Sequence, residues 1–435
     1  MPESAQQFVN SFRSSAPYIR AHRGRTFILY LSGETLACDN FASLIHDIAL
    51  LNSLGVRLVL VHGARPQIEQ QLQALNIPSV IEDGQRVTDR QCLAAVEQAV
   101  GQLRLNLESR LSMGLINTPM SGSALQVVSG NFVTAKPYGI RNGNDYGHTG
   151  DVRKINTRAI IHQLDLGNLV LLTPIAHSLT GEAFNCRSED VAMETAIALQ
   201  ADKLILVTES DKIVGPDSET LHQLSLLHAE EYLNQQTTMN QEHLKCAIKA
   251  CKKGVNRSHI ISHEKDGALL QELFTRDGTG TLITTETYEG LRHATIHDVR
   301  GILELISPLE QEGILVRRSR EQLELEIDRF SVIERDGMII ACAAVYVYDD
   351  NMAEIACLAT HENYRNHGRG EMLLQHLQQQ CKNKGVEKLF LLTTHTAHWF
   401  IEKGFVETDI NTLPVQRREL YNVQRNSRVF CKTLG

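Results

Sequence analysis

Short apolar runs alternate with amphipathic stretches from residue 26 to residue 284, and this alternation restricts the possible folds more than any other feature. The runs TFILYL, RLVLVHG and KLILVTES have the length and apolar content of buried strands. The stretches between the strands carry apolar residues at helical spacing, and one of them begins after Asp89, a favourable N-cap residue. Buried strands that alternate with helices predict an α/β domain with a mostly parallel central sheet.

A different pattern follows residue 290. The segment FSVIERDGMIIACAAVYVYDDNMAEIACLAT predicts three consecutive antiparallel strands, with turns at Asp336-Gly337 and at residues 349–351. A loop, a helical pattern and the strand-like run KLFLLTT come next, as is typical of an α+β domain. We therefore predict a short helix within residues 1–25, an α/β domain over 26–284, a linker at 285–290 and an α+β domain over 291–435.

Composition excludes several classes of function. The net charge of −8 disfavours non-specific binding to nucleic acid or to anionic membranes. No apolar run approaches the ~20 residues of a membrane span, and the N-terminus lacks the pattern of a secretory signal. The nine cysteines are dispersed without a C-x-x-C pair, which favours reduced thiols over disulfides or a zinc site. We expect a cytoplasmic protein, and no metal is implied.

The loop RNHGRG, residues 365–370, precedes a helical pattern and predicts an anion site. Gly368 and Gly370 lack a Cβ, so the backbone there can approach a ligand closely. The free N–H groups and the dipole at a helix start attract an anion, and Arg365 and Arg369 add positive charge. A nucleotide-binding P-loop is excluded because no G-K-[ST] follows the glycines.

The same loop fits R-x-x-G-x-G, so the region resembles the GCN5-related N-acetyltransferases, and the preceding strand EIACLAT strengthens the resemblance. The resemblance implies acetyl-CoA as co-substrate, with its pyrophosphate on Arg365, Asn366, His367, Gly368, Arg369 and Gly370. It also implies that backbone groups of Cys357, Leu358 and Ala359 hold the pantetheine arm and direct an N–H at the thioester carbonyl. Transfer in that family is direct, so we interpret Cys357 as a packed thiol.

Direct transfer needs a base for the amine and an acid for the departing thiolate. Glu354, on the same strand, is our candidate base, acting directly or through water. Many relatives use a tyrosine as the acid, but the matching position here is Phe400. Thr393 is the nearest alternative, Thr394 competes with it, and solvent is a further proton source.

Arginines cluster at LVRRS and VQRRELYNVQRNSRV, which predicts an anionic acceptor. Each carboxylate of glutamate suits a planar arginine fork. We assign Arg317, with Leu315 beside it, to one carboxylate and Arg417 and Arg425 to the other. Some arginines of these clusters must be ordinary surface charge.

Residues 26–284 resemble the amino-acid kinase family, and acetylglutamate kinase most closely, through VHGARPQI, RVTD, DYGHTGDV and ILVTESDKIVG. The position of the family's phosphate-binding lysine is Tyr30, and its glycine pair is Ser32-Gly33. A phenol cannot supply the fixed positive charge that phosphoryl transfer requires. The resemblance therefore implies a retained fold with a binding or assembly role.

Arginine-inhibited kinases of this family carry an N-terminal helix that joins dimers into a hexameric ring, and they bind arginine beside it. The matching positions here are Tyr18, His259, Glu272 and Gly278, and Glu272 could pair bidentately with a guanidinium. The two halves together resemble the bacterial N-acetylglutamate synthases of arginine biosynthesis. This implies an acyltransferase for L-glutamate, inhibited by L-arginine and assembled as a homo-oligomer, for which we expect a hexamer, with a dimer as the open alternative. A working acetylglutamate kinase and a catalytically silent arginine sensor are the alternatives.

Overall fold

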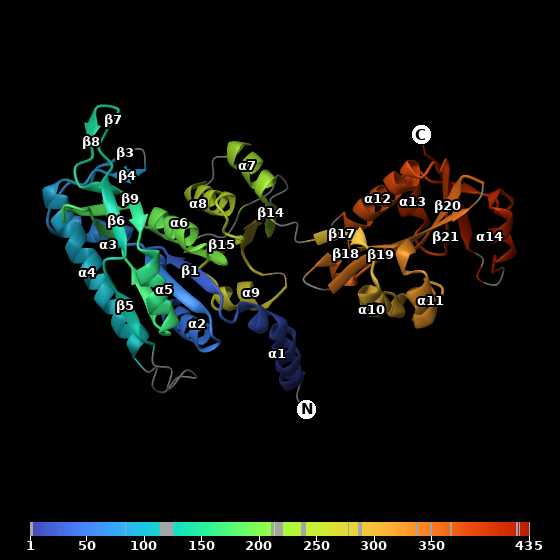
Figure 1. Ribbon diagram of the computed structural model, residues 1–435, viewed down its shortest axis with the longest axis horizontal. Helices are drawn as coiled ribbons and strands as arrows, with labels where there is room; N and C mark the ends of the chain where they lie inside the picture. Colours follow the sequence, from blue (N-terminus) through green and yellow to red (C-terminus); the bar gives the residue numbers. More distant parts are fainter. Residues whose placement is uncertain are drawn as a thin grey trace. The chain divides into compact units, whose positions relative to one another are not determined.

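The computed structural model describes every residue except 1–2, 83, 114–124, 210–212, 214–220, 236–240, 277, 286–288, 336–337, 349, 366–367, 423–424, 426 and 435. The chain divides into two compact units, Met1–Glu286 and Thr287–Gly435 (Figure 1). Residues 286–288 of the linker that we assigned lie outside the described part. Glu289 and Gly290, which we also assigned to it, begin strand β17 (Glu289–His293), because their backbone pairs with the neighbouring strand.

The first unit is built on an eight-stranded sheet in the order β14-β16-β15-β13-β1-β2-β10-β5. Only the β15–β16 pair is antiparallel, so the prediction of a mostly parallel central sheet is confirmed. The strands are β1 (Thr26–Leu31), β2 (Arg57–His62), β5 (Val127–Ser129), β10 (Leu169–Leu172), β13 (Lys203–Thr208), β14 (Gln223–Ser225), β15 (Arg257–Ser262) and β16 (Thr281–Thr284).

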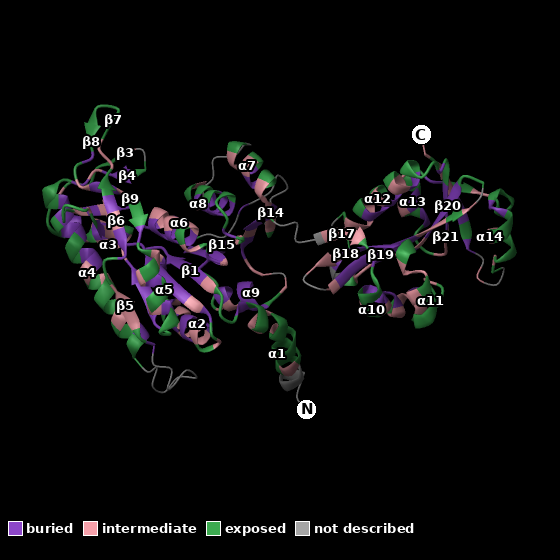
Figure 2. Ribbon diagram, viewed as in Figure 1, coloured by how far each residue is buried: buried purple, intermediate pink, exposed green. Residues whose placement is uncertain are grey.

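Both faces of this sheet are buried, as Figure 2 shows by the buried residues at the centre of the unit. Successive side chains of β1 point to opposite faces. Ile28 and Tyr30 enter a core with helices α5 (Thr157–Asp165), α6 (Ser188–Leu199) and α8 (Gln241–Lys252). Phe27, Leu29 and Leu31 enter the other core, with α2 (Phe41–Ser53), α4 (Arg90–Ser112) and α9 (Ala268–Phe274). This two-sided burial explains why the strands are apolar without alternation.

A small closed barrel stands beside the sheet, in the order β11-β12-β9-β6. Its strands are β6 (Val133–Pro137), β9 (Thr149–Ile155), β11 (Ile175–His177) and β12 (Ala183–Cys186). The remaining elements of the first unit are α3 (Arg65–Ala74), α7 (Leu226–Gln235), β3 (Ile81–Glu82), β4 (Gln85–Arg86), β7 (Ile140–Arg141), β8 (Asn144–Asp145) and η1 (Thr35–Ala37). Three of the barrel strands have only three to five residues, and the seven residues of β9, TGDVRKI, show no regular apolar alternation, so the sequence did not predict the barrel.

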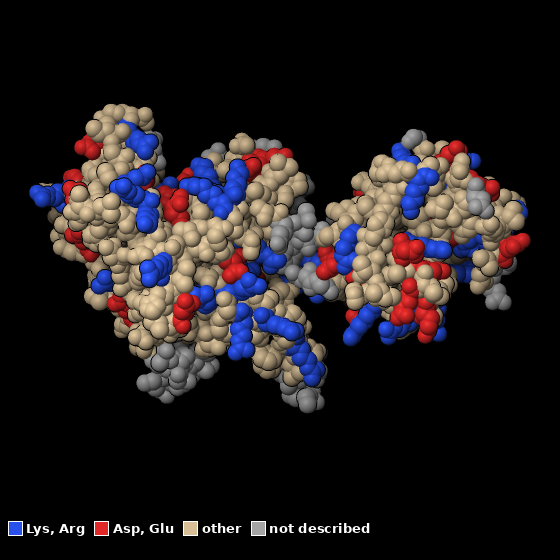
Figure 3. Space-filling model, viewed as in Figure 1, with Lys and Arg blue, Asp and Glu red and all other residues tan. Residues whose placement is uncertain are grey.

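Helix α1 (Glu3–His22) docks on α9 through side chains that donate to carbonyls at the end of that helix. The Ser15 hydroxyl lies 3.1 Å from the Phe274 oxygen, and His22 Nε2 lies 2.7 Å from the Leu273 oxygen. Burial, and then the charge of Lys203, lowers the pKa of His22 to about 4, so the ring is a neutral donor at pH 7. Basic side chains are visible on α1 in Figure 3, and both arginines of this helix, Arg13 and Arg20, are exposed. Among the described helices, none combines the length and apolarity needed to cross a bilayer.

The second unit is a seven-stranded sheet in the order β17-β18-β19-β20-β21-β23-β22. The further strands are β18 (Phe330–Arg335), β19 (Met338–Tyr348), β20 (Met352–Thr360), β21 (Lys388–Thr393), β22 (Val406–Thr408) and β23 (Arg428–Thr433). Helix α10 (Val299–Gln311) covers one face, and α12 (Arg369–Asn383) covers the other. The shorter helices are α11 (Arg320–Leu325), α13 (Ala397–Glu402), α14 (Val415–Glu419), η2 (Ile296–Asp298), η3 (Ile327–Arg329), η4 (Glu362–Tyr364) and η5 (Ile410–Thr412).

Strands β18 to β20 pair antiparallel as predicted, although residues 336–337 and 349 of the two turns lie outside the described part. The β20–β21 pair is parallel and short. It joins Met352–Glu354 to residues 388–390, although β20 continues to Thr360 and β21 to Thr393. Beyond Glu354 the two strands therefore separate, and the β21-facing edge of β20 leaves the ladder.

Candidate active site

Glu354 lies on β20 just before the two strands separate, and only 6% of its surface is exposed. Its partner across the β19–β20 ladder is Tyr346, and Tyr348 faces Met352 in the same ladder. Side chains two residues apart on a strand share a face. The sheet therefore places the two tyrosines and Glu354 on one face.

The Glu354 carboxylate is held by three donors. Arg417, on α14, reaches it with both arms of its guanidinium, Nε to Oε2 at 2.6 Å and a terminal nitrogen to Oε1 at 3.0 Å. The Tyr348 hydroxyl lies 3.2 Å from Oε2. Burial, and then the charge of Glu354, raises the pKa of Tyr348 to about 12, so this phenol stays protonated and donates. Burial alone would lower the pKa of Arg417, but its hydrogen bonds to Glu354 raise it.

Two other arginines belong to the same region. Arg318 is half-buried beside Tyr346 and Cys357, and its backbone N–H donates to Glu310 Oε1 at 2.9 Å. Arg425 donates to the carbonyls of Gly313 and Ile314 and so anchors the segment before Leu315. Its Nε is buried without a hydrogen-bond partner among the described residues.

The predicted acceptor residues are thus only partly brought together. Leu315 packs against the core that α10 covers, whereas Arg317 is exposed. Sequence reasoning placed Arg318 in an arginine cluster without assigning it to the site, and it missed Tyr346 and Tyr348. The tyrosines could have been found by counting outward from the turn at 349–351, because two-residue periodicity places residues 346 and 354 opposite each other.

The stretch after Glu354 contains a bulge. Cys342 pairs with Ala359 and Ala344 with Ala356, so Cys357 and Leu358 together oppose one residue of β19. Cys357 has φ of 54°, and its side chain enters the α10 core while Leu358 packs on the other face. The predicted pantetheine residues therefore lie where β20 leaves the β21 ladder, and Cys357 is a buried thiol.

The predicted pyrophosphate loop leads into α12. Gly368 is the N-cap with φ of 74°, and the side chains of the described residues do not cap this helix start. A Cβ on Gly368 would meet nothing within 4 Å, so the left-handed backbone, rather than close packing within the chain, calls for glycine. Arg369 stacks 5.1 Å from the Tyr364 ring, and Arg365 Nε lies 3.4 Å from the Thr360 oxygen. Asn366 and His367 lie outside the described residues.

A Cβ on Gly370 would come within 3.5 Å of Trp399, an ordinary contact distance. The structure therefore tolerates a side chain at position 370 more readily than at position 368, where the positive φ disfavours any residue with a Cβ.

Thr393 ends β21, and its hydroxyl organises the turn into α13. Its Oγ1 accepts the N–H groups of His395 at 3.3 Å and Thr396 at 3.2 Å, and lies 3.0 Å from the Thr396 hydroxyl. Thr394 instead contacts the His395 ring at 2.8 Å. Phe400 is buried against the Trp399 and Phe405 rings and offers no hydroxyl. The proton donor stays a prediction.

In the first unit, the carboxyl ends of β1, β2 and β13 border a cavity of about 320 Å³. Tyr30, Ser32 and Gly33 line it together with Arg65 and Glu189. Burial raises the pKa of Tyr30 well above its usual value, so the phenol is neutral at pH 7. The position expected for a phosphate-binding lysine therefore carries no positive charge.

Three of the residues that we predicted to bind L-arginine, namely His259, Glu272 and Gly278, lie together where β15 faces α9. Glu272 Oε1 lies 2.6 Å from His259 Nδ1, and its Oε2 accepts the N–H groups of Thr279 at 2.7 Å and Gly280 at 2.9 Å. A Cβ on Gly278, where φ is 63°, would lie 2.4 Å from Glu272 Oε2. Tyr18 packs against the same core as α9. The carboxylate that we expected to receive a guanidinium thus already has three donors.

His259 is neutral at pH 7, because burial and then the charge of Lys203 lower its pKa to about 4. Its Nδ1–H donates to Glu272, while its Nε2 lies 3.2 Å from Lys203 Nζ and accepts from it. The imidazole therefore bridges a buried cation and a buried anion.

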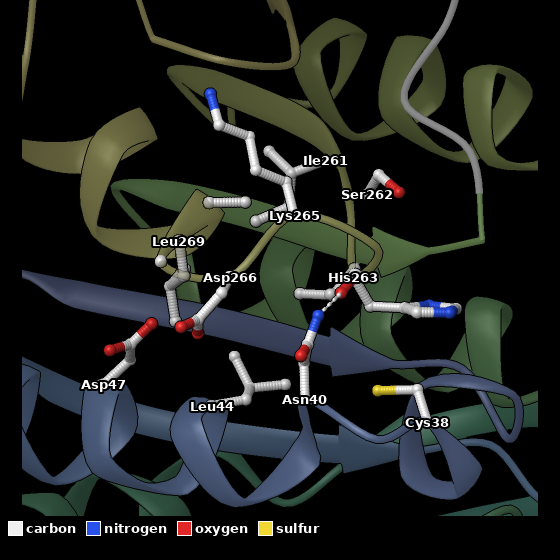
Figure 4. A pocket seen from close by; sticks show the side chains of 13 residues that line it. Cys38, Asn40, Leu44, Asp47, Ile261, Ser262, His263, Lys265, Asp266 and Leu269 are labelled. Atoms are coloured by element: carbon white, nitrogen blue, oxygen red, sulfur yellow. Dashed lines mark hydrogen bonds between the residues drawn. The ribbon is translucent and has the colours of Figure 1, made fainter.

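Another small pocket lies between α2 and the loop before α9 (Figure 4). The carboxylates of Asp47 and Asp266 face each other there. Burial, and then the charge of Asp266, raises the pKa of Asp47 to about 7. Asp47 thus gains and loses its proton near neutral pH.

Comparison with known proteins places both units in families. Residues 25–262 match the amino acid kinase family, and residues 299–405 match the acetyltransferase (GNAT) family. The amino-acid acetyltransferases of Yersinia pseudotuberculosis and Yersinia pestis are 49% identical over the whole length of both chains. N-acetylglutamate synthase of Neisseria gonorrhoeae, solved with coenzyme A and L-arginine, is 38% identical with a TM-score of 0.86, over 98% of this chain and 99% of that one.

A second structure from N. gonorrhoeae, with coenzyme A and N-acetyl-glutamate, is 39% identical with a TM-score of 0.63 over the same shares of the two chains. The match to the Yersinia enzymes covers both units of this chain. The chain therefore belongs to the family of amino-acid acetyltransferases, and its N-terminal unit is a member of the amino acid kinase family.

Proposed function

We propose that this enzyme transfers the acetyl group of acetyl-CoA to the amine of L-glutamate, the first step of arginine biosynthesis. The observation that carries the proposal is the full-length similarity to the N. gonorrhoeae synthase, which was solved with coenzyme A and with N-acetyl-glutamate. A cluster of arginines around one buried carboxylate supports it, because a dicarboxylate acceptor needs more positive charge than a monocarboxylate.

Acetyl-CoA would lie where β20 and β21 separate. Its pantetheine amides would pair with the backbone of Cys357, Leu358 and Ala359, since this edge of β20 is outside the β21 ladder. Its pyrophosphate would sit at the start of α12 with Arg365 and Arg369. The predicted contacts of Asn366, His367 and Gly370 complete this site.

Glutamate would place its carboxylates among Arg417, Arg425 and Arg317, with Leu315 alongside. Arg318 is a further cation close to this position. Guanidinium forks fix the two planar carboxylates and so direct the amine toward the thioester.

In the reaction, Glu354 takes a proton from the glutamate ammonium, directly or through water. The amine then attacks the thioester carbonyl, and a β20 backbone N–H stabilises the oxyanion. The C–N bond forms, the nitrogen releases its second proton to solvent, the C–S bond breaks, and the CoA thiolate leaves. Thr393 or solvent returns a proton to the thiolate.

The kinase-like unit would act as a regulator that binds L-arginine near Tyr18, His259, Glu272 and Gly278. The arginine bound in the N. gonorrhoeae structure supports this proposal. Tyr30 argues against phosphoryl transfer, because its neutral phenol cannot stabilise the transferring phosphate. Helix α1 would join copies of the chain into a homohexamer in the cytoplasm.

Thiol release from acetyl-CoA, measured with and without glutamate and with added arginine, tests the function on protein whose mass is measured in the same buffer. We expect glutamate-dependent release that arginine suppresses, in a particle of six chains. Arginine binding without thiol release would identify a silent sensor instead. Phosphate release from ATP in the presence of N-acetylglutamate would identify a kinase.

A further inference from the structure

The two residues assigned to separate roles in the reaction are bound to each other. Glu354 is the expected base, and Arg417 is expected to bind the acceptor, yet the Arg417 fork spans both oxygens of Glu354. The Glu354 carboxylate accepts three hydrogen bonds in all. Two come from the Arg417 guanidinium, and the third comes from the Tyr348 hydroxyl. Both oxygens of Glu354 are thus already occupied by donors, so the lone pairs that would receive the proton of the acceptor are taken.

The Glu354–Arg417 ion pair is mostly buried, but solvent still reaches part of both side chains. The side chain of Glu354 is 8% exposed and that of Arg417 is 18% exposed. Arg417 stands on α14, a helix of five residues, and its other terminal nitrogen makes only a 3.4 Å contact with the Leu420 oxygen. The guanidinium is therefore held in place chiefly by Glu354 itself.

An acceptor's carboxylate offers Arg417 the same planar pair of oxygens that Glu354 offers. The two carboxylates cannot both take the Nε and terminal N–H groups of one fork. Tyr348 is not affected by this exchange, because it belongs to β19 and its hydroxyl reaches Glu354 from the neighbouring strand of the sheet. It can keep Glu354 in position after Arg417 has moved.

We propose that the acceptor carboxylate takes the Arg417 fork from Glu354, so that Glu354 becomes an effective base only when an acceptor is bound. Arg417 is then a gating residue that senses the carboxylate and releases the base. This inference rests on the proposed function, in which acetyl-CoA and an amino acid meet beside Glu354.

The gate has a chemical purpose. A free carboxylate beside a thioester can also act as a general base for the attack of water. The resulting attack would form a C–O bond, break the C–S bond and waste acetyl-CoA as acetate and free CoA. Pairing with Arg417 suppresses that hydrolysis until the acceptor occupies the site.

The first experiment uses the unmodified enzyme with glutarate, which has both carboxylates of glutamate but no amine. Glutarate should compete with glutamate, and it should accelerate the release of acetate and CoA thiol, because it frees Glu354 while leaving room for water. We expect an increase of roughly tenfold or more, since a positioned general base contributes about 10²–10⁴-fold. Competition without faster hydrolysis overturns the proposal, and so does a failure of glutarate to compete.

The second experiment opens the gate by substitution. Arg417→Gln should raise thiol release in the absence of acceptor while lowering transfer to glutamate. The double variant Arg417→Gln/Glu354→Gln should return that release to the level of the unmodified enzyme. The matched control is Arg428→Gln, which breaks an exposed arginine–glutamate fork with Glu407 in the same unit and should leave both rates unchanged.

A separate measurement of CoA affinity shows whether the Arg417→Gln variant is folded. Intact CoA affinity without increased acceptor-independent release refutes the gate. If the variant does not fold, the glutarate experiment on the unmodified enzyme decides alone. Glutamate-dependent thiol release by the unmodified enzyme tests the proposed function independently of both experiments.

Discussion

Glu272→Gln should destabilise the kinase-like unit by an amount that the structure allows us to work out. The carboxylate accepts from His259 through Oε1 and from the N–H groups of Thr279 and Gly280 through Oε2. A glutamine has one oxygen, so its amide group must face either the two backbone N–H groups or His259. Turning His259 to its other tautomer would then direct its Nε2–H at the Lys203 ammonium.

In every orientation of the new amide at position 272 and every tautomer of His259, two hydrogen-bond donors therefore face each other in the buried site. Hydrogen bonds to a charged group contribute about 1.5–3 kcal/mol each, so we expect a loss of about 2–4 kcal/mol in the free energy of unfolding. For a unit of this size, such a loss lowers Tm by about 3–7 °C. Differential scanning calorimetry of the full chain measures the change, because the single tryptophan, Trp399, lies in the other unit and its fluorescence would not report on this one.

The dependence on pH separates this mechanism from a general packing defect. The pKa of Glu272 is lowered to about 2 from an ordinary 4.5, where burial opposes the shift and the His259 and backbone hydrogen bonds outweigh it. A lowered carboxyl pKa gives stability that is complete above pH 4.5 and is lost as the pH falls toward 2. The difference between the two proteins should therefore shrink in acid, where the protonated glutamate resembles glutamine.

The exposed Glu264→Gln serves as the control and should leave Tm unchanged at every pH. An unaltered Tm for Glu272→Gln at pH 7 would refute the hydrogen-bond argument. A Tm difference that is the same at pH 7 and pH 3 would refute the role of the charge.

Three further predictions concern other parts of the chain. Glu354→Gln should slow glutamate acetylation by roughly 10²-fold or more, because the base is lost, while CoA affinity stays the same, because the proposed CoA contacts lie elsewhere, on residues 357–359 and at the start of α12; an unchanged pH–rate profile would remove Glu354 from that role. Gly368→Ala should weaken CoA binding measured by calorimetry, because a left-handed residue with a Cβ costs about 1 kcal/mol and the α12 start would shift; equal affinities would contradict this. The pKa of Asp47 is raised in the folded chain, so its ionisation destabilises the fold increasingly as the pH rises from about 4 through 7. Asp47→Asn should therefore raise Tm more at pH 8 than at pH 5, and an equal change at both pH values would refute the raised pKa.

Much of the architecture was predictable because it is encoded locally. The apolar runs of β1, β2, β10 and β13 report burial on both faces, and this in turn requires helices on both sides. The antiparallel region was equally readable, since its turns fix the pairing of β19 with β20. The barrel strands were missed because their own patterns are brief or irregular. The first residues of β17 were missed because their pairing partners, on β18, are distant in sequence.

The candidate site divides in the same way. The glycine before α12, the carboxylate on β20 and the arginine-rich segments follow from residue types and spacing alone. Their contacts do not. Glu354 and Arg417 are separated by 63 positions, and nothing in either segment indicates that one fork binds the other carboxylate.

By itself, the sequence determined the two kinds of sheet, the loop that can hold a phosphate and the loss of the kinase lysine at Tyr30. Only the tertiary structure decided that Arg417 holds Glu354, that His259 and two backbone N–H groups already occupy Glu272, and that His22 ties α1 to α9. The physical reason is the distance along the sequence over which each kind of information acts. Periodicity records which face of a helix or strand is buried, whereas hydrogen bonds between distant segments depend on where packing and loop geometry finally place the side chains.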